Sequence, residues 1–160
     1  MTFGQGSYLA GAITAAQYEL GLAPSTNAAG QTITKAMIIL SDGEFGAPNS
    51  GKDGVSPGAS GNVGWSSSTP CGDALNAATQ AKNAGTIIFS IAYNSSGNCG
   101  PDTGTGGLTN EGAAALMKAL ASTGDYISTS GDLTTAFGEA ADQLTGNSVL
   151  TPDCPQAVCS

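Results

Sequence analysis

Residues Lys35 to Glu44 read Lys-Ala-Met-Ile-Ile-Leu-Ser-Asp-Gly-Glu, and this stretch decides the fold. A short apolar run that stops at a polar turn predicts a fully buried strand of a parallel α/β sheet. Ligands of such sheets bind beyond the carboxyl ends of the strands, which is where Asp42 follows the run. Gly43 allows the chain to turn sharply behind it. Asp42 is therefore the first candidate for a binding residue.

The segments around this strand alternate between helical and extended patterns. Ser7 and Asp132 fit helix N-cap positions, and Gly85 fits the end of a helix. Alternation of this kind requires right-handed crossovers and predicts an α/β fold, with a mostly parallel sheet and helices on both faces. Helices are expected over residues 6–20, 73–84, 111–122 and 132–144, and strands over 34–40, 86–93 and 125–129.

The amino-acid composition argues against two classes of binding partner, nucleic acids and anionic membranes. The chain has 160 residues, enough for one domain with a sizeable core. Four lysines and no arginine face twelve acidic residues, which gives a net charge of -8. Nucleic acids and anionic membrane surfaces are bound by clusters of Lys and Arg, so neither is expected as a partner.

The absence of histidine limits the chemistry further. No Ser-His-Asp or Cys-His mechanism can be written, and a bound metal should be a hard cation such as Mg²⁺ or Ca²⁺. Asp42 and Glu44 are a candidate pair of catalytic carboxylates, but neighbouring acids in a solvated turn are far more often only acidic. We therefore expect a protein that is not an enzyme.

The four cysteines do not have zinc-site spacing, and they allow three disulfide pairings. We favour Cys71–Cys99 together with Cys154–Cys159. Cys71 lies at the start of a helix and Cys99 in the loop after the next strand, and both positions belong to the carboxyl edge of a parallel sheet. Disulfides and a Gly/Ser/Thr-rich composition indicate an extracellular, cell-surface or periplasmic protein. No signal peptide or transmembrane run is visible, so an export signal would lie upstream of Met1 or have been removed.

A Gly/Ser-rich connection over residues 44–70 contains Trp65, the only tryptophan. Loops of this length are uncommon in compact domains. Trp65 either pins the loop onto the domain or offers an exposed aromatic contact to a partner. The sequence leaves both alternatives open.

Four stretches, taken in order, resemble the von Willebrand factor type A domain, particularly that of bacterial TadG-like surface proteins. They are a helix start at residues 6–13, a strand ending in Ser-Asp-Gly at residues 37–44, a helix-Gly-strand unit at residues 77–93, and a closing segment at residues 116–137. The resemblance implies a three-layer, Rossmann-like fold. It makes residues 1–145 a partial domain of this type and residues 146–160 a tail with Cys154 and Cys159.

Domains of this family carry a metal-ion-dependent adhesion site on the carboxyl edge of the sheet. By resemblance, Ser7 takes the place of its threonine ligand and Asp42 that of its aspartate, with Mg²⁺ or Ca²⁺ as the cation. The family's Asp-x-Ser-x-Ser loop occurs nowhere in the 160 residues. The implied metal site is therefore incomplete.

The family's first three strands precede the helix that begins near Ser7. The strand over residues 34–40 would then have an open edge, which upstream sequence, a second chain or a copy of this chain is expected to cover. Two functions fit. The first is a cell-surface adhesion or protein-binding module, and the second is a metal-independent structural subunit of an extracellular filament or pilus-like assembly.

Overall fold

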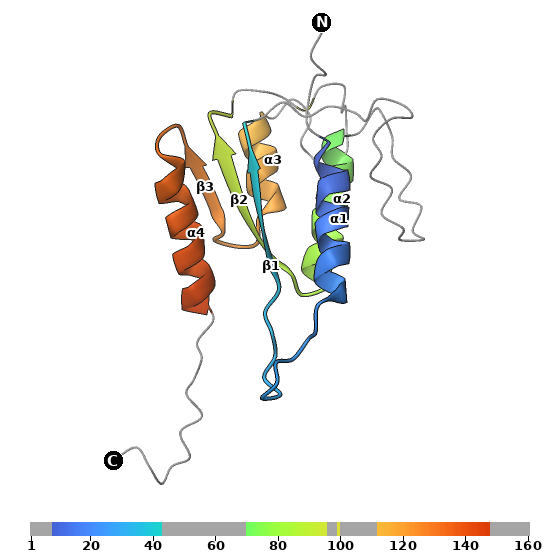
Figure 1. Ribbon diagram of the computed structural model, residues 1–160. Helices are drawn as coiled ribbons and strands as arrows, with labels where there is room; N and C mark the ends of the chain where they lie inside the picture. The colour runs from blue at the N-terminus through green and yellow to red at the C-terminus, as the bar shows by residue number, and fades with distance from the viewer. Residues whose placement is uncertain (1–7, 43–69, 96–98, 100–111, 148–160) are drawn as a thin grey trace, which may run out of the picture.

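The computed structural model describes residues 8–42, 70–95, 99 and 112–147. Helices and strands alternate in it, as expected (Figure 1). Most boundaries lie within three residues of the expected ones, and α4 continues to the end of the described chain. In chain order the elements are α1 (Leu9–Leu22), β1 (Ala36–Ser41), α2 (Pro70–Asn83), β2 (Ile87–Tyr93), α3 (Ala113–Leu120), β3 (Tyr126–Thr129) and α4 (Leu133–Asn147).

The three strands form one parallel sheet in the order β1-β2-β3. Ala36 pairs with Ile87 across the first two strands, and Ser90 pairs with Tyr126 across the second pair. Parallel neighbours need a crossover connection, and α2 and α3 are those connections. The α/β class with a parallel sheet is thereby confirmed.

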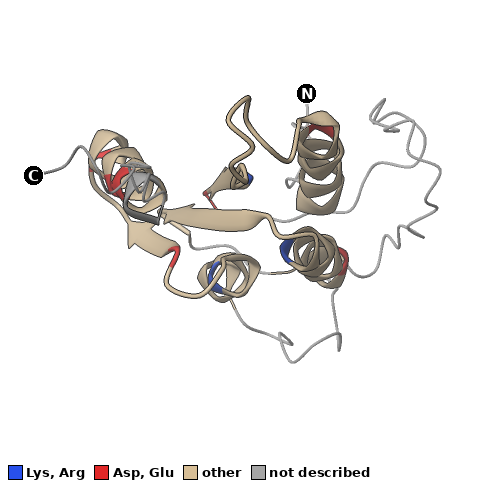
Figure 2. Ribbon diagram, turned by 90° about the horizontal axis from the view of Figure 1, so that it is seen from below, with Lys and Arg blue, Asp and Glu red and all other residues tan. Residues whose placement is uncertain are grey.

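One face of the sheet carries the main core. Met37 and Ile39 of β1 and Ile88 and Ala92 of β2 belong to the same buried cluster as the apolar faces of α1, α2 and α3. The opposite face is covered by α4, which packs on β2 and β3 (Figure 2). Alanines line much of the helix contact and allow the backbones to approach closely. The members contributed by α2 are Cys71, Ala74, Ala77, Ala78 and Ala81.

The expectation that the strand before Asp42 is fully buried is wrong. Burial alternates along β1, so that Met37, Ile39 and Ser41 are buried whereas Ile38 and Leu40 are 40% and 41% exposed. A parallel strand reads as a continuous apolar run because both faces are usually covered. Here only one face of β1 is covered by described residues.

Local signals at the helix ends are partly confirmed. Asp132 caps α4, since its Oδ1 accepts a hydrogen bond of 2.8 Å from the backbone N–H of Thr134. Gly85 follows α2 with a φ of 83°, a left-handed conformation that glycine adopts without strain. The expected N-cap at Ser7 is wrong, because α1 starts one residue later and the N-cap position is Tyr8, with no side-chain capping bond.

Candidate functional site

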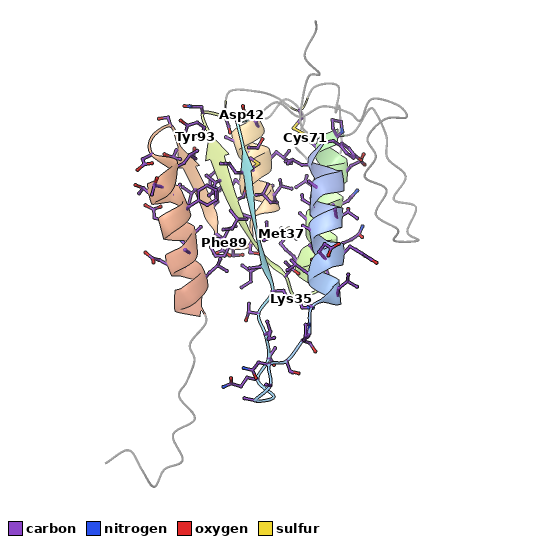
Figure 3. All side chains as sticks on the ribbon, viewed as in Figure 1. Lys35, Met37, Asp42, Cys71, Phe89 and Tyr93 are labelled. Atoms are coloured by element: carbon purple, nitrogen blue, oxygen red, sulfur yellow. A yellow bond between two sulfur atoms is a disulfide. The ribbon has the colours of Figure 1, made fainter. Side chains whose placement is uncertain are left out.

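The predicted binding residue Asp42 follows β1 at the carboxyl end of the sheet (Figure 3). Its side chain is exposed, whereas that of the preceding Ser41 is buried. The Ser41 carbonyl accepts a hydrogen bond of 3.4 Å from Oγ of Ser95, which follows β2. The ends of the two strands are therefore linked directly beside Asp42.

The turn after β2 has a constrained backbone. Asn94 has a φ of 49°, which few residues other than glycine and asparagine adopt readily. Its backbone N–H donates to the carbonyl of Thr129, the last residue of β3, at 3.0 Å. All three strand ends are thus held together at one edge of the sheet.

The Cys71–Cys99 disulfide is confirmed, with a Cα–Cα distance of 5.7 Å. It joins the first turn of α2 to the segment that follows β2, and both residues are buried. The bridge closes a loop over a sequence separation of 28, for which the chain-entropy model gives about 3–4 kcal/mol of stabilisation. The disulfide therefore stabilises the same edge of the sheet that carries Asp42.

The start of α1 carries a side chain that sequence reasoning missed. Burial raises the pKa of the Tyr8 phenol well above its usual range, and the negative charge of Asp73 in the first turn of α2 raises it further. The ring of Tyr8 also lies close to Gly11, where an added Cβ would come within 3.2 Å of it. Tyr8 is thus a neutral, packed side chain between the starts of α1 and α2.

The implied metal site has little support among the residues described. Asp42 is present, Ser7 lies outside the described residues, and the described ranges hold no group of three or more Cys, Asp or Glu side chains that could bind a cation. Ca²⁺ takes six to eight oxygen ligands and Mg²⁺ an octahedral set, which protein groups and water molecules supply together. Within the described ranges, the single exposed carboxylate of Asp42 is too few ligands to hold Mg²⁺ or Ca²⁺ by itself.

The side edge of β1 is the second candidate. The Lys35 carbonyl accepts from the N–H of Ile87, so the odd-numbered residues of β1 direct their backbone groups toward β2. The N–H and C=O groups of Ala36, Ile38 and Leu40 consequently point away from the sheet. Within the described ranges β1 has no strand on that side.

Apolar side chains accompany these backbone groups. Ile38 and Leu40 lie on the face of the sheet that α4 covers over β2 and β3, yet they stay exposed. Phe137 of α4 is exposed to the same degree, 40%. The sequence predicted an open edge at β1, but it did not predict that Ile38 and Leu40 would be exposed on one face of the strand. A continuous apolar run does not indicate which of the two faces is uncovered.

Five of the candidate residues lie outside the described part of the chain. They are Ser7, Glu44, Trp65, Cys154 and Cys159. The two alternatives for Trp65 and the second disulfide pairing stay predictions. In the described part of the chain no helix has the length and apolar character needed to cross a membrane.

Comparisons with protein-family models, with curated proteins and with solved structures found no match for this chain. The resemblance to the von Willebrand factor type A domain therefore rests on the sequence stretches alone. The class that the structure defines is an α/β protein with a three-stranded parallel sheet and four helices in its described part.

Proposed function

We propose that this chain is a non-catalytic protein-binding module that works outside the cytoplasm and captures an extended segment of a partner protein at β1. The observation that carries the proposal is the edge of β1. There the backbone groups of Ala36, Ile38 and Leu40 have no strand partner in the described part of the chain, and two apolar side chains are exposed beside them. Edge strands are templates for strand addition, and natural proteins usually protect them with charges, prolines or bulges. β1 has none of these protections.

Residue content and the exposed Asp42 are in keeping with a binding role, and the disulfide bears on location. Histidine and arginine are absent from the whole sequence. Asp42 is exposed at the edge, and the described residues hold no group of three or more Cys, Asp or Glu side chains that could bind a cation. The buried Cys71–Cys99 bridge favours an oxidising compartment, in keeping with an extracellular, cell-surface or periplasmic location.

Because the partner is unidentified, the test uses a random peptide library displayed on phage and selected on the folded, immobilised protein. Ile38→Lys is the edge variant, since an added lysine is a natural means of blocking strand addition. Thr135→Lys, on an exposed position of α4, carries the same new charge away from β1 and is the matched control. We expect the wild type and Thr135→Lys to enrich peptides with an uncharged, β-branched central stretch, and Ile38→Lys to lose them. Equal enrichment on all three proteins would contradict the proposal.

The second candidate is a structural subunit that uses the same edge to pack against other copies in a filament. Sedimentation velocity over a wide range of protein concentrations separates the two functions. Concentration-dependent assembly that Ile38→Lys abolishes favours the structural subunit. A sedimentation coefficient that is constant with concentration favours capture of a different protein.

A further inference from the structure

Opposite charges mark the two ends of β1. Lys35 directly precedes the strand and Asp42 directly follows it, seven residues further along, and no charged residue lies between them. The Lys35 ammonium donates to the carbonyl of Ala23 at 3.0 Å, which leaves two of its three N–H donors for other acceptors. The Asp42 side chain is exposed. A strand added to this edge would meet a positive charge at one end and a negative charge at the other.

An extended segment fits this edge better than a second folded copy of the chain. α1 packs beside α2 in the core on one face of the sheet, so it leaves the side edge of β1 open (Figure 2). A single added strand needs only about 5 Å beside β1, whereas a second copy would bring its own helices to the edge as well. Two copies would also each carry a net charge of -8 and repel one another.

The direction of the added strand follows from the chemistry of the edge. A segment from a separate chain needs no crossover connection, and antiparallel pairing is slightly more stable per residue than parallel pairing. An antiparallel segment passes Asp42 first and Lys35 last. Opposite charges in an interface fix register and orientation.

We propose that the segment bound at β1 runs antiparallel to it. From its amino end, the segment has a basic residue, then about six uncharged apolar or β-branched residues, and then an acidic residue. This inference rests on the proposed function and specifies its ligand. The basic residue lies near Asp42 and the acidic residue near Lys35. The side chains on the face of Ile38 and Leu40 are apolar, because they cover those two residues.

Two capped peptides of equal composition test the order of charges. The first is Lys-Thr-Val-Thr-Val-Thr-Val-Asp, which places valines opposite Leu40 and Ile38 when Lys lies beside Asp42, and the second has its terminal Lys and Asp exchanged. Binding to the ¹⁵N-labelled protein is followed by NMR titration and by hydrogen exchange at the amides of Ala36, Ile38 and Leu40. A spin label on the amino end of each peptide reports direction, because it broadens the amides nearest to it.

We expect the first peptide to bind about 3- to 30-fold more tightly than the second, with the preference reduced in 1 M NaCl. Its label should broaden signals near Asp42. In the double variant Lys35→Asp/Asp42→Lys the preference should invert. Equal affinities, or a label that broadens signals near Lys35 with the first peptide, would overturn the assigned order. Failure of either peptide to protect the β1 amides, together with no enrichment in the display selection, would overturn the proposed function as well.

Discussion

Ile38 and Phe89 are register partners in neighbouring parallel strands, yet Phe89 is fully buried and Ile38 is 40% exposed. Paired residues of a parallel sheet point to the same face, so the difference comes from what covers each strand. α4 packs on β2 and β3, and no described element covers β1 on this face. The same face of one sheet is therefore core at β2 and surface at β1.

Because β2 is covered on this face and β1 is not, truncating Phe89 should lower the free energy of unfolding more than truncating Ile38. Phe89→Ala should lower the free energy of unfolding by about 3–5 kcal/mol, since it removes a fully buried ring. Ile38→Ala should lower it by about 1 kcal/mol or less, because much of the side chain is already in water. Urea denaturation followed by circular dichroism measures both. Similar losses in the two variants would mean that another part of the protein covers Ile38.

The Cys71–Cys99 bridge should be the main covalent support of the carboxyl edge. Cys71→Ser/Cys99→Ser should lower the free energy of unfolding by about 2–4 kcal/mol, and a reductant should have little further effect on this variant. Cys154→Ser/Cys159→Ser is the matched control, which separates the tail cysteines from the bridge. If the control loses as much stability as the edge variant, the predicted importance of the bridge is wrong.

The buried phenol of Tyr8 predicts a loss of stability in alkali. Its pKa in the folded protein is raised above the ordinary value of 10.0 by burial and by Asp73. The unfolded chain therefore loses the phenol proton first, and the stability that Tyr8 contributes is complete below pH 10 and falls as the pH rises above it. Urea denaturation at pH 8 and pH 11 should show a smaller alkaline loss for Tyr8→Phe than for the wild type.

Tyr18→Phe is the control for this measurement, because Tyr18 lies on the exposed side of α1. It should follow the wild type at both pH values. An equal alkaline loss in Tyr8→Phe and wild type would show that other groups account for the pH dependence.

Lys82 connects α2 to the end of α3. Its ammonium donates to the carbonyls of Ala119 and Ala121, each at 3.2 Å, and burial lowers its pKa. Lys82→Met keeps the aliphatic stem and removes these bonds, so we expect a loss of about 1–2 kcal/mol in the free energy of unfolding. Lys118→Met, an exposed lysine in the last turn of α3, should change it by less than about 0.5 kcal/mol. Thermal denaturation of the two variants in parallel makes the comparison, and a larger loss in Lys118→Met would contradict it.

A metal titration tests the site implied at Asp42. With one exposed carboxylate, Mg²⁺ at about 5 mM should shift the melting temperature by no more than about 1 °C. Asp42→Asn should respond in the same way. A larger shift that Asp42→Asn removes would mean that residues beyond the described ranges, Ser7 among them, complete a cation site.

The sequence by itself determined the order of elements and the parallel sheet. Local signals predicted these elements, because they act within a few residues of one another. Examples are the apolar run Met37–Leu40, the glycine at the end of α2 (Gly85) and the N-cap of α4 (Asp132). The pairing of Cys71 with Cys99 also followed, because topology alone brings the helix start and the next loop to one edge.

Only the tertiary structure decided which apolar residues are core. Ile38 and Ile39 are identical in type and adjacent in sequence, but one is exposed and the other is buried under helices contributed by distant segments. The raised pKa of Tyr8 likewise depends on α2, more than sixty residues away. The burial of a side chain depends on which other segments pack against it. An apolar run in the sequence therefore does not show which face of the strand remains exposed.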